Sequence, residues 1–82
     1  MEIKVLLCKN ERKRIVTIQV GDDVRYLKKL AVEAFNLAAD LSVTLEYYDT
    51  DFDDWIEAED DYNPSDKEKF NVVVKKDEVS QV

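Results

Sequence analysis

The fold is decided in residues 1–38, which read MEIKVLLCKNERKRIVTIQVGDDVRYLKKLAVEAFNLA. Apolar and polar residues alternate over residues 3–7 and again over residues 16–20. A period of two predicts half-buried strands. The polar link over residues 8–14 has the length of a hairpin connection, so we expect the two strands to pair antiparallel. The alternating apolar residues are Ile3, Val5, Leu7, Val16, Ile18 and Val20.

A helix pattern follows the second strand. Asp22 and Asp23 precede a run in which apolar residues recur at spacings of three and four, which places them on one helical stripe. An aspartate at this position can accept a hydrogen bond from a free backbone N–H group of the first turn. We therefore predict a helix from about residue 24 to residue 37. Its apolar stripe consists of Val24, Leu27, Leu30, Ala31, Ala34, Phe35 and Ala38.

Shorter patterns fill the rest of the chain. Residues 42–48 are rich in β-branched and aromatic residues and predict a strand, and Trp55 and Ile56 predict a brief further strand. Turn-forming residues at 61–66 precede a last alternation over residues 70–74. One helix with a single apolar stripe needs one sheet face to cover. We therefore predict an α+β fold in which a mixed sheet of about four to five strands packs against one main helix.

Length and composition indicate one folded domain. The chain has 82 residues, which suffice for one small core and not for two. The apolar share of 45% is typical of folded chains, so the 38% of charged residues predicts a heavily solvated surface. No apolar run approaches the roughly 20 residues that span a bilayer, and the first residues are too short in apolar length for a signal peptide. We expect an intracellular protein, cytoplasmic or nuclear.

Two residue types that enzymes often use are scarce. Cys8 is the one cysteine, and the chain has no histidine. An internal disulfide is therefore impossible, and the commonest general base and metal ligand is absent. Cys8 is expected to be a buried or half-buried small apolar residue. We expect no enzyme activity and no cofactor.

The net charge of −7 hides a division of charge along the chain. Residues 1–29 carry +4, residues 30–66 carry −12 without any Lys or Arg, and residues 67–82 carry +1. A strongly acidic surface repels phosphate groups, so neither nucleic acid nor an anionic membrane is expected as a partner. A basic protein surface is the natural counterpart of the acidic stretch.

Both ends of the chain resemble the ubiquitin superfamily. Residues 1–5 (MEIKV) resemble its opening strand, and residues 61–63 (DYN) followed by residues 70–74 resemble its turn and closing strand. The resemblance covers about residues 1–76 and implies a ubiquitin-like β-grasp domain. In that fold the last strand pairs in parallel with the first in the middle of the sheet. Residues 77–82 are expected to form a flexible C-terminal tail.

Two departures imply that the activities of ubiquitin itself are absent. No Gly-Gly pair follows the last strand, where residues 75–78 read KKDE, so conjugation is not expected. Glu46 stands where the third strand of the family carries the central isoleucine of its recognition patch. Ubiquitin receptors are therefore not expected to bind this chain.

The acidic stretch resembles a second branch of the same fold. Residues 48–56 (YDTDFDDWI) resemble the OPCA motif of Phox/Bem-type interaction domains, whose Asp-x-Asp-x-Asp run docks onto lysine and arginine of a partner domain. Asp49, Asp51 and Asp53 match that run, and Lys4 matches the first-strand lysine of the family. The resemblance implies answering basic residues on the first two strands.

The chain departs from that family at two places. Phe52 stands where the family usually has glycine, and the second helix of the family has no room between residues 61 and 70. The electrostatic pattern remains, because crowded carboxylates cost stability and indicate a partner, a cation or a solubilising surface.

These features predict a non-enzymatic protein-interaction module that docks an acidic loop onto a basic partner surface, with weak head-to-tail self-association as a special case. For the basic residues, a polar hairpin tip that simply stays solvated is the alternative. The candidate contact residues are Asp49, Asp51, Asp53, Asp54, Glu57, Glu59 and Asp60 on the acidic side and Lys4, Arg12, Lys13 and Arg14 on the basic side.

Two other functions are left open. The spacing of Asp49, Asp51, Asp53 and Asp60 approximates a calcium loop, which would make the domain a divalent-cation-binding module. However, Asp54 occupies the sixth position, where the sharp turn of such loops needs glycine. The other alternative is an inert domain appended to a larger scaffold protein.

The aromatic residues near the acidic loop have two possible roles. Trp55 is expected to pin the loop onto the core, with contact to a partner as the alternative. Tyr47 and Tyr48 are adjacent on a strand, so one of them should face inward and the other should be exposed beside the loop.

Overall fold

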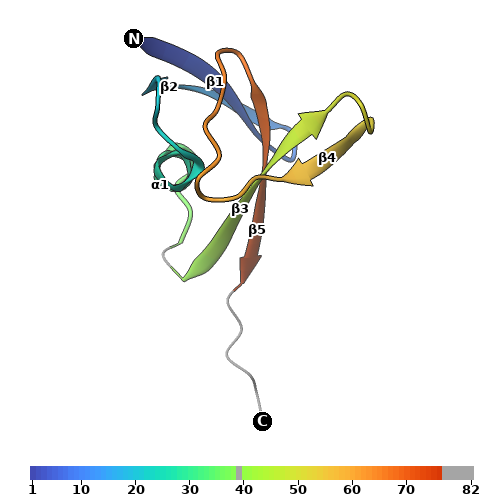
Figure 1. Ribbon diagram of the computed structural model, residues 1–82. Coiled ribbons are helices and arrows are strands. Elements are labelled where there is room, and N and C mark those ends of the chain that lie inside the picture. Colours follow the sequence, from blue (N-terminus) through green and yellow to red (C-terminus); the bar gives the residue numbers. More distant parts are fainter. Residues whose placement is uncertain (39, 77–82) are drawn as a thin grey trace.

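A computed structural model of the chain describes residues 1–38 and 40–76. Figure 1 shows a helix on one side of a sheet and a hairpin that projects away from it. The predicted α+β architecture is confirmed, whereas the predicted tail at residues 77–82 lies outside the described residues. In chain order the elements are β1 (Glu2–Lys9), β2 (Arg12–Gln19), α1 (Val24–Ala34), β3 (Leu41–Asp49), β4 (Asp54–Glu57) and β5 (Lys69–Lys76).

The strands form one mixed sheet in the order β2-β1-β5-β3-β4. β1 pairs antiparallel with β2 and parallel with β5, and β3 pairs antiparallel with both β5 and β4. The parallel pair aligns Leu7 with Phe70 in the middle of the sheet, as expected for the last and first strands. Both edge strands, β2 and β4, thus belong to hairpins.

The core lies between α1 and one face of the sheet. Along β1 the side chains alternate, so that Ile3, Val5 and Leu7 are buried toward the helix. We call the opposite sheet face the open face. The buried apolar residues are Ile3, Val5, Leu7, Ile18, Val24, Leu27, Ala31, Phe35, Leu45, Ala58, Phe70 and Val72.

The helix begins where the sequence predicts and ends earlier. The carboxylate of Asp23 accepts a hydrogen bond from the backbone N–H of Tyr26 at 3.2 Å, which caps the first turn. At the other end Asn36 has φ of 54°, and the N–H of Leu37 donates to the carbonyl of Val32 at 2.9 Å. A left-handed asparagine with this bond closes a helix. The predicted extension to residue 37 is therefore wrong, and Ala38 is exposed.

Two details of the first hairpin also differ from the prediction. The ladder continues to Lys9 and Arg12, so the link is much shorter than residues 8–14. Polar side chains can stay in water while their backbone groups pair, and Asn10 adopts a positive φ of 57° at the turn. Val20 follows the last ladder pair of β2 and is 60% exposed, so it does not join the core.

Candidate functional site

Residues 49–54, which we call the acidic hairpin, join β3 to β4. Asp49 and Asp54 face each other across the last ladder pair. One carboxylate oxygen of Asp49 accepts hydrogen bonds from the backbone N–H groups of Asp51 at 2.8 Å and Phe52 at 3.3 Å. Asp53 then turns the chain with φ of 53°. Asp49 therefore shapes the hairpin, because an aspartate side chain can replace the backbone as acceptor in a turn.

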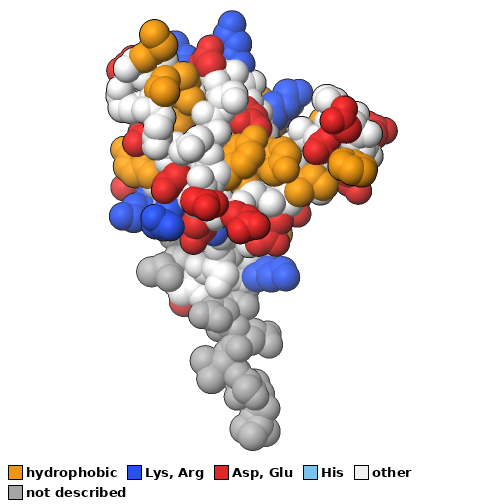
Figure 2. Space-filling view, viewed as in Figure 1, with side chains coloured by type: hydrophobic (Ala, Val, Ile, Leu, Met, Phe, Trp, Pro, Cys, Tyr) orange, Lys and Arg blue, Asp and Glu red, His pale blue; other side chains and the backbone are white. Residues whose placement is uncertain are grey.

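Aromatic side chains brace the acidic hairpin. The hydroxyl of Tyr48 donates a hydrogen bond to the carboxylate of Asp53. The rings of Tyr48 and Trp55 pack edge to face, with centroids 5.4 Å apart, and one carboxylate oxygen of Asp54 accepts from the backbone N–H of Trp55 at 2.8 Å. In Figure 2 acidic and apolar side chains lie side by side at the end of the molecule that carries this hairpin.

Trp55 does not pin the loop onto the core. It is 37% exposed and lies opposite Tyr48 on the open face, whereas its neighbour Ile56 lies opposite Tyr47 on the helix side. The side-chain alternation along β4 sets this orientation. Of the adjacent tyrosines, Tyr47 packs against the core and Tyr48 is exposed, as predicted. Cys8 is half-buried, also as predicted.

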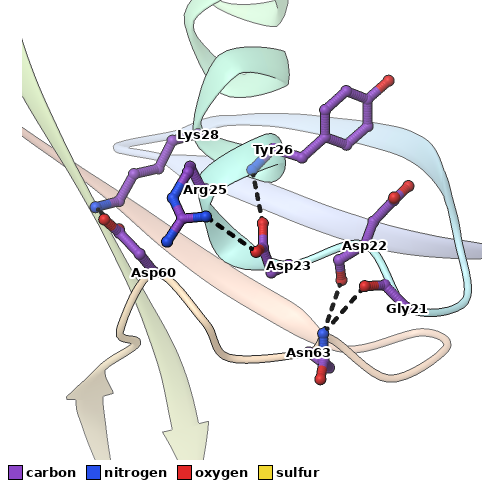
Figure 3. Close-up of polar contacts among 8 residues, drawn as sticks. All are labelled: Gly21, Asp22, Asp23, Arg25, Tyr26, Lys28, Asp60 and Asn63. Atoms are coloured by element: carbon purple, nitrogen blue, oxygen red, sulfur yellow. Dashed lines mark hydrogen bonds and ion pairs between the residues drawn. The ribbon is translucent and has the colours of Figure 1, made fainter.

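The acidic residues from Glu57, the last residue of β4, to Asp60 form a separate group. Glu57 and Glu59 are exposed on either side of Ala58, which is buried and donates its N–H to the carbonyl of Leu45 at 2.8 Å. The carboxylate of Asp60 accepts a hydrogen bond from the ammonium of Lys28 at 2.7 Å (Figure 3). That hydrogen bond and the charge of Lys28 lower the pKa of Asp60. Asp60 thus already has a basic partner within its own chain.

The segment after Asp60 is tied to the start of the helix. The side-chain amide of Asn63 donates to the carbonyls of Gly21 at 3.2 Å and Asp22 at 3.4 Å (Figure 3). The N–H of Val24 donates to the carbonyl of Tyr62 at 2.9 Å. These bonds hold the connection between β4 and β5 against the body of the domain.

Tyr62 anchors the same segment from its other side. Its ring stacks on Tyr47 with centroids 4.8 Å apart, and its hydroxyl donates to the carboxylate of Glu68 at 2.5 Å. Burial raises the pKa of Tyr62, and the hydrogen bond to Glu68 raises it further. Tyr62 and Asn63 of the predicted Asp-Tyr-Asn turn therefore hold the fold together here, whereas residues 49–54 remain exposed or half-buried.

The four basic candidates do not form one cluster. Lys4 and Lys13 lie on the open face. Lys4 alternates with the buried residues of β1, as Leu6 and Cys8 do, and Lys13 lies opposite Cys8 in the ladder. Arg12 and Arg14 point to the helix side, where their guanidinium carbons lie 5.5 and 5.9 Å from the centre of the Phe35 ring. The alternation of β2 separates them. Arg12, Lys13 and Arg14, which are adjacent in the sequence, are therefore divided between the two faces of the sheet and do not form one basic cluster at the end of the hairpin.

The acidic hairpin and the strand that carries Lys13 lie at opposite edges of the sheet. β4 and β2 are its two edges, separated by four strand spacings, or about 19 Å at about 4.8 Å each. This separation exceeds the Debye length of about 8 Å at physiological salt. The acidic hairpin is therefore far from Lys13, and within residues 1–38 and 40–76 no ion pair joins its carboxylates to a lysine or arginine.

Sequence reasoning missed two lysines beside Lys4. The backbone N–H of Lys67 donates to the carbonyl of Lys4 at 2.6 Å, and Lys69 lies opposite Leu6 in the parallel ladder. The signal was available, because the expected pairing of the last strand with the first brings this segment next to β1. An open hollow of about 520 Å³ here is lined by Glu2, Lys4, Val5, Leu6, Ile15, Asp66, Lys67 and Lys69.

Two negative findings apply to residues 1–38 and 40–76. No three Asp, Glu or Cys side chains there come together in a way that could hold a metal ion. Within the same residues, no helix has the length and apolar character needed to cross a membrane.

Comparison with known proteins identifies the fold. No family model and no curated protein matches the sequence. Among solved structures, the PB1 domain of the AtNBR1 filament (L-type), determined by cryo-EM, is similar with a TM-score of 0.70 and 23% identity over 92% of this chain and 99% of that one. The ubiquitin-like domain of an Arabidopsis thaliana protein, determined by NMR, is similar with a TM-score of 0.64 and 17% identity over 99% of this chain and 85% of that one. The chain has the ubiquitin-like β-grasp fold.

A third solved structure is similar in fold at a comparably low sequence identity. It comes from a study of molecular mimicry of SUMO in DNA repair, with a TM-score of 0.63 and 20% identity over 88% of this chain and 90% of that one. The predicted ubiquitin-like β-grasp is thus confirmed. The resemblance of residues 48–56 to Phox/Bem-type domains agrees with the similarity of this β-grasp domain to a PB1 domain.

Proposed function

We propose that this β-grasp domain is a non-enzymatic protein-interaction module that docks its acidic hairpin onto a basic partner surface, including that of a second copy. The observation that carries this proposal is the exposure of Asp51, Asp53 and Asp54 at one sheet edge, where no lysine or arginine of residues 1–38 and 40–76 forms an ion pair with them. Carboxylates that are unpaired within one chain can meet basic residues of a second chain.

The geometry favours open chains of copies over closed dimers. A contact between the hairpin of one copy and the open face of the next uses two different surfaces, and such heterologous contacts repeat. The similar AtNBR1 PB1 domain was determined as a filament. Exposed ion pairs contribute about 0 to 1 kcal/mol each, so several must act together and the contact should be weak.

A charge swap tests the proposal. Asp51, exposed at the hairpin tip, is changed to Lys in one sample, and Lys4 is changed to Asp in another. Sedimentation velocity should show less association for each variant alone than for the wild type, and recovery when the two are mixed. Glu33→Lys, which makes the same charge change on the exposed side of α1, is the matched control and should leave association intact.

Salt provides the second measurement. Association should weaken as the Debye length falls from about 10 Å at 0.1 M salt to about 3 Å at 1 M. The same variants can be used in a pull-down from cell extract, which covers partners other than a second copy. Binding that is indifferent to both salt and Asp51→Lys would reduce the acidic hairpin to a solubilising surface.

A further inference from the structure

Phe52 is an exposed aromatic residue at the tip of the acidic hairpin. Its side chain is 76% exposed, although the backbone around it is held by the hydrogen bonds to Asp49. Tyr48 and Trp55, in contrast, pack on each other. A phenyl group presented at a fixed turn between Asp51 and Asp53 combines an apolar tip with acidic flanks. This combination requires a matching surface with an apolar floor and a basic rim.

The hollow beside β1 has those properties. Its floor includes Leu6, which is half-buried, and Ile15, which is 69% exposed and lies opposite Leu6 in the ladder. Lys4, Lys67 and Lys69 line its rim. Glu2 and Asp66 also line it, and Lys13 lies two residues before Ile15 on the same face of β2. The lysines outnumber the carboxylates, so the surface around the hollow is basic, although the net charge of the chain is −7.

A second hollow at the other side of the molecule lacks this complementarity. It is formed where the segment after β4 meets the helix, and its lining includes Arg25 and Lys28 but four carboxylates. One of these carboxylates, that of Asp60, already accepts a hydrogen bond from the ammonium group of Lys28. An acidic hairpin would be repelled there. Of these two hollows, the one beside β1 is therefore the one that suits the hairpin.

We propose that Phe52 of one copy inserts into the hollow of a second copy, over Leu6 and Ile15, while Asp51 and Asp53 approach the lysines of the rim. This inference rests on the proposed docking function and adds an apolar anchor to it. Full burial of a phenylalanine side chain typically contributes enough to change affinity about tenfold or more. The anchor gives the contact a component that salt does not screen.

The test uses two variants that can form one contact only. The first variant keeps the hollow, and its hairpin loses the two carboxylates and the phenyl group through Asp51→Asn, Phe52→Ser and Asp53→Asn. The second variant keeps the hairpin, and two lysines that line its hollow are reversed in charge by Lys4→Glu and Lys69→Glu. Titration of the isotope-labelled first variant with the second, followed by amide NMR shifts, measures dissociation constants into the millimolar range. The shifts should centre on Leu6 and Ile15.

A double-mutant cycle in this pair then isolates the anchor. Phe52→Ala in the hairpin partner and Ile15→Ala in the hollow partner should each weaken binding, the first about tenfold. Their combination should weaken binding by less than the product of the two single effects, because both changes remove the same contact. Tyr26→Ala and Val20→Ala, at exposed positions outside both surfaces, are the matched controls and should not change the dissociation constant.

The outcomes separate the anchor from the proposed function. If the pair binds in a salt-dependent way but Phe52→Ala has no effect, or if the two substitutions act independently, the anchor is wrong and charge docking stands. If the pair does not bind at millimolar concentration, self-docking itself is overturned, and with it the anchor.

Discussion

The ammonium group of Lys28 lies 2.7 Å from the carboxylate of Asp60 and joins the segment after β4 to the helix. This pair divides the acidic stretch into two parts with different roles. Asp60 is engaged within the chain, whereas Asp51 is exposed at the hairpin tip. A basic partner should therefore be attracted more strongly to the carboxylates of the hairpin than to Asp60.

The Lys28–Asp60 pair should make stability depend on acid pH. The pKa of Asp60 is lowered below its ordinary value of 3.8, so the stabilisation is fully present above that value and is lost as pH falls through the folded-state pKa. The free energy of unfolding of the wild type should approach that of Lys28→Met as pH falls from about 5 to about 2. Urea unfolding at several pH values measures it, with Lys29→Met as the neighbouring control. A pH-independent difference between wild type and Lys28→Met would contradict the pairing.

Tyr62 should make stability depend on alkaline pH. Its pKa is raised above the ordinary value of 10.0 by burial and by the bond to Glu68, so its contribution is present below that value and is lost as pH rises through the folded-state pKa. Tyr62→Phe keeps the ring and removes the hydroxyl, which should cost about 1 to 2 kcal/mol at neutral pH. Urea unfolding compared with Tyr26→Phe, an exposed tyrosine, measures the cost. Equal stability of the two variants would show that the Glu68 bond contributes nothing.

Leu27 should be the most costly helix position to truncate. It has no exposed surface and lies in the contact between α1 and the sheet. Leu27→Ala should lower the free energy of unfolding by about 2 to 5 kcal/mol, because it removes buried carbon atoms and leaves a cavity. Chemical denaturation followed by circular dichroism measures this, with Lys29→Ala on the exposed side of α1 as control. A loss below about 1 kcal/mol would place Leu27 outside the core.

The acidic hairpin should not bind calcium tightly. Carboxylate oxygens of Asp49, Asp53 and Asp54 accept hydrogen bonds from backbone N–H groups or from Tyr48, and they do not converge on a common point. Calorimetric titration should show no saturable binding tighter than about 10⁻⁴ M, the weak end of natural calcium loops. Saturable binding that disappears when Asp49, Asp51 and Asp53 become Asn would favour the cation-binding alternative over docking.

The contacts that sequence patterns describe are local, and these were predictable. The alternation over residues 3–7, the helical stripe and the cap at Asp23 each depend on residues two to four positions apart, whose geometry the backbone sets. The position of the acidic hairpin between two strands follows from the same patterns. The end of the helix was missed because Asn36 can adopt a left-handed conformation, which periodicity does not report.

The amino-acid sequence alone determined the strands, the helix, the order of elements and the concentration of charge in residues 30–66. Only the tertiary structure decided that Arg12 and Arg14 lie over the ring of Phe35 and that Asp60 is paired with Lys28. The physical reason is the separation along the chain: the backbone N–H of Lys4 bonds to the carboxylate of Asp66, 62 positions away. Such neighbours depend on which face the helix covers and on the strand order, and no local spacing encodes either.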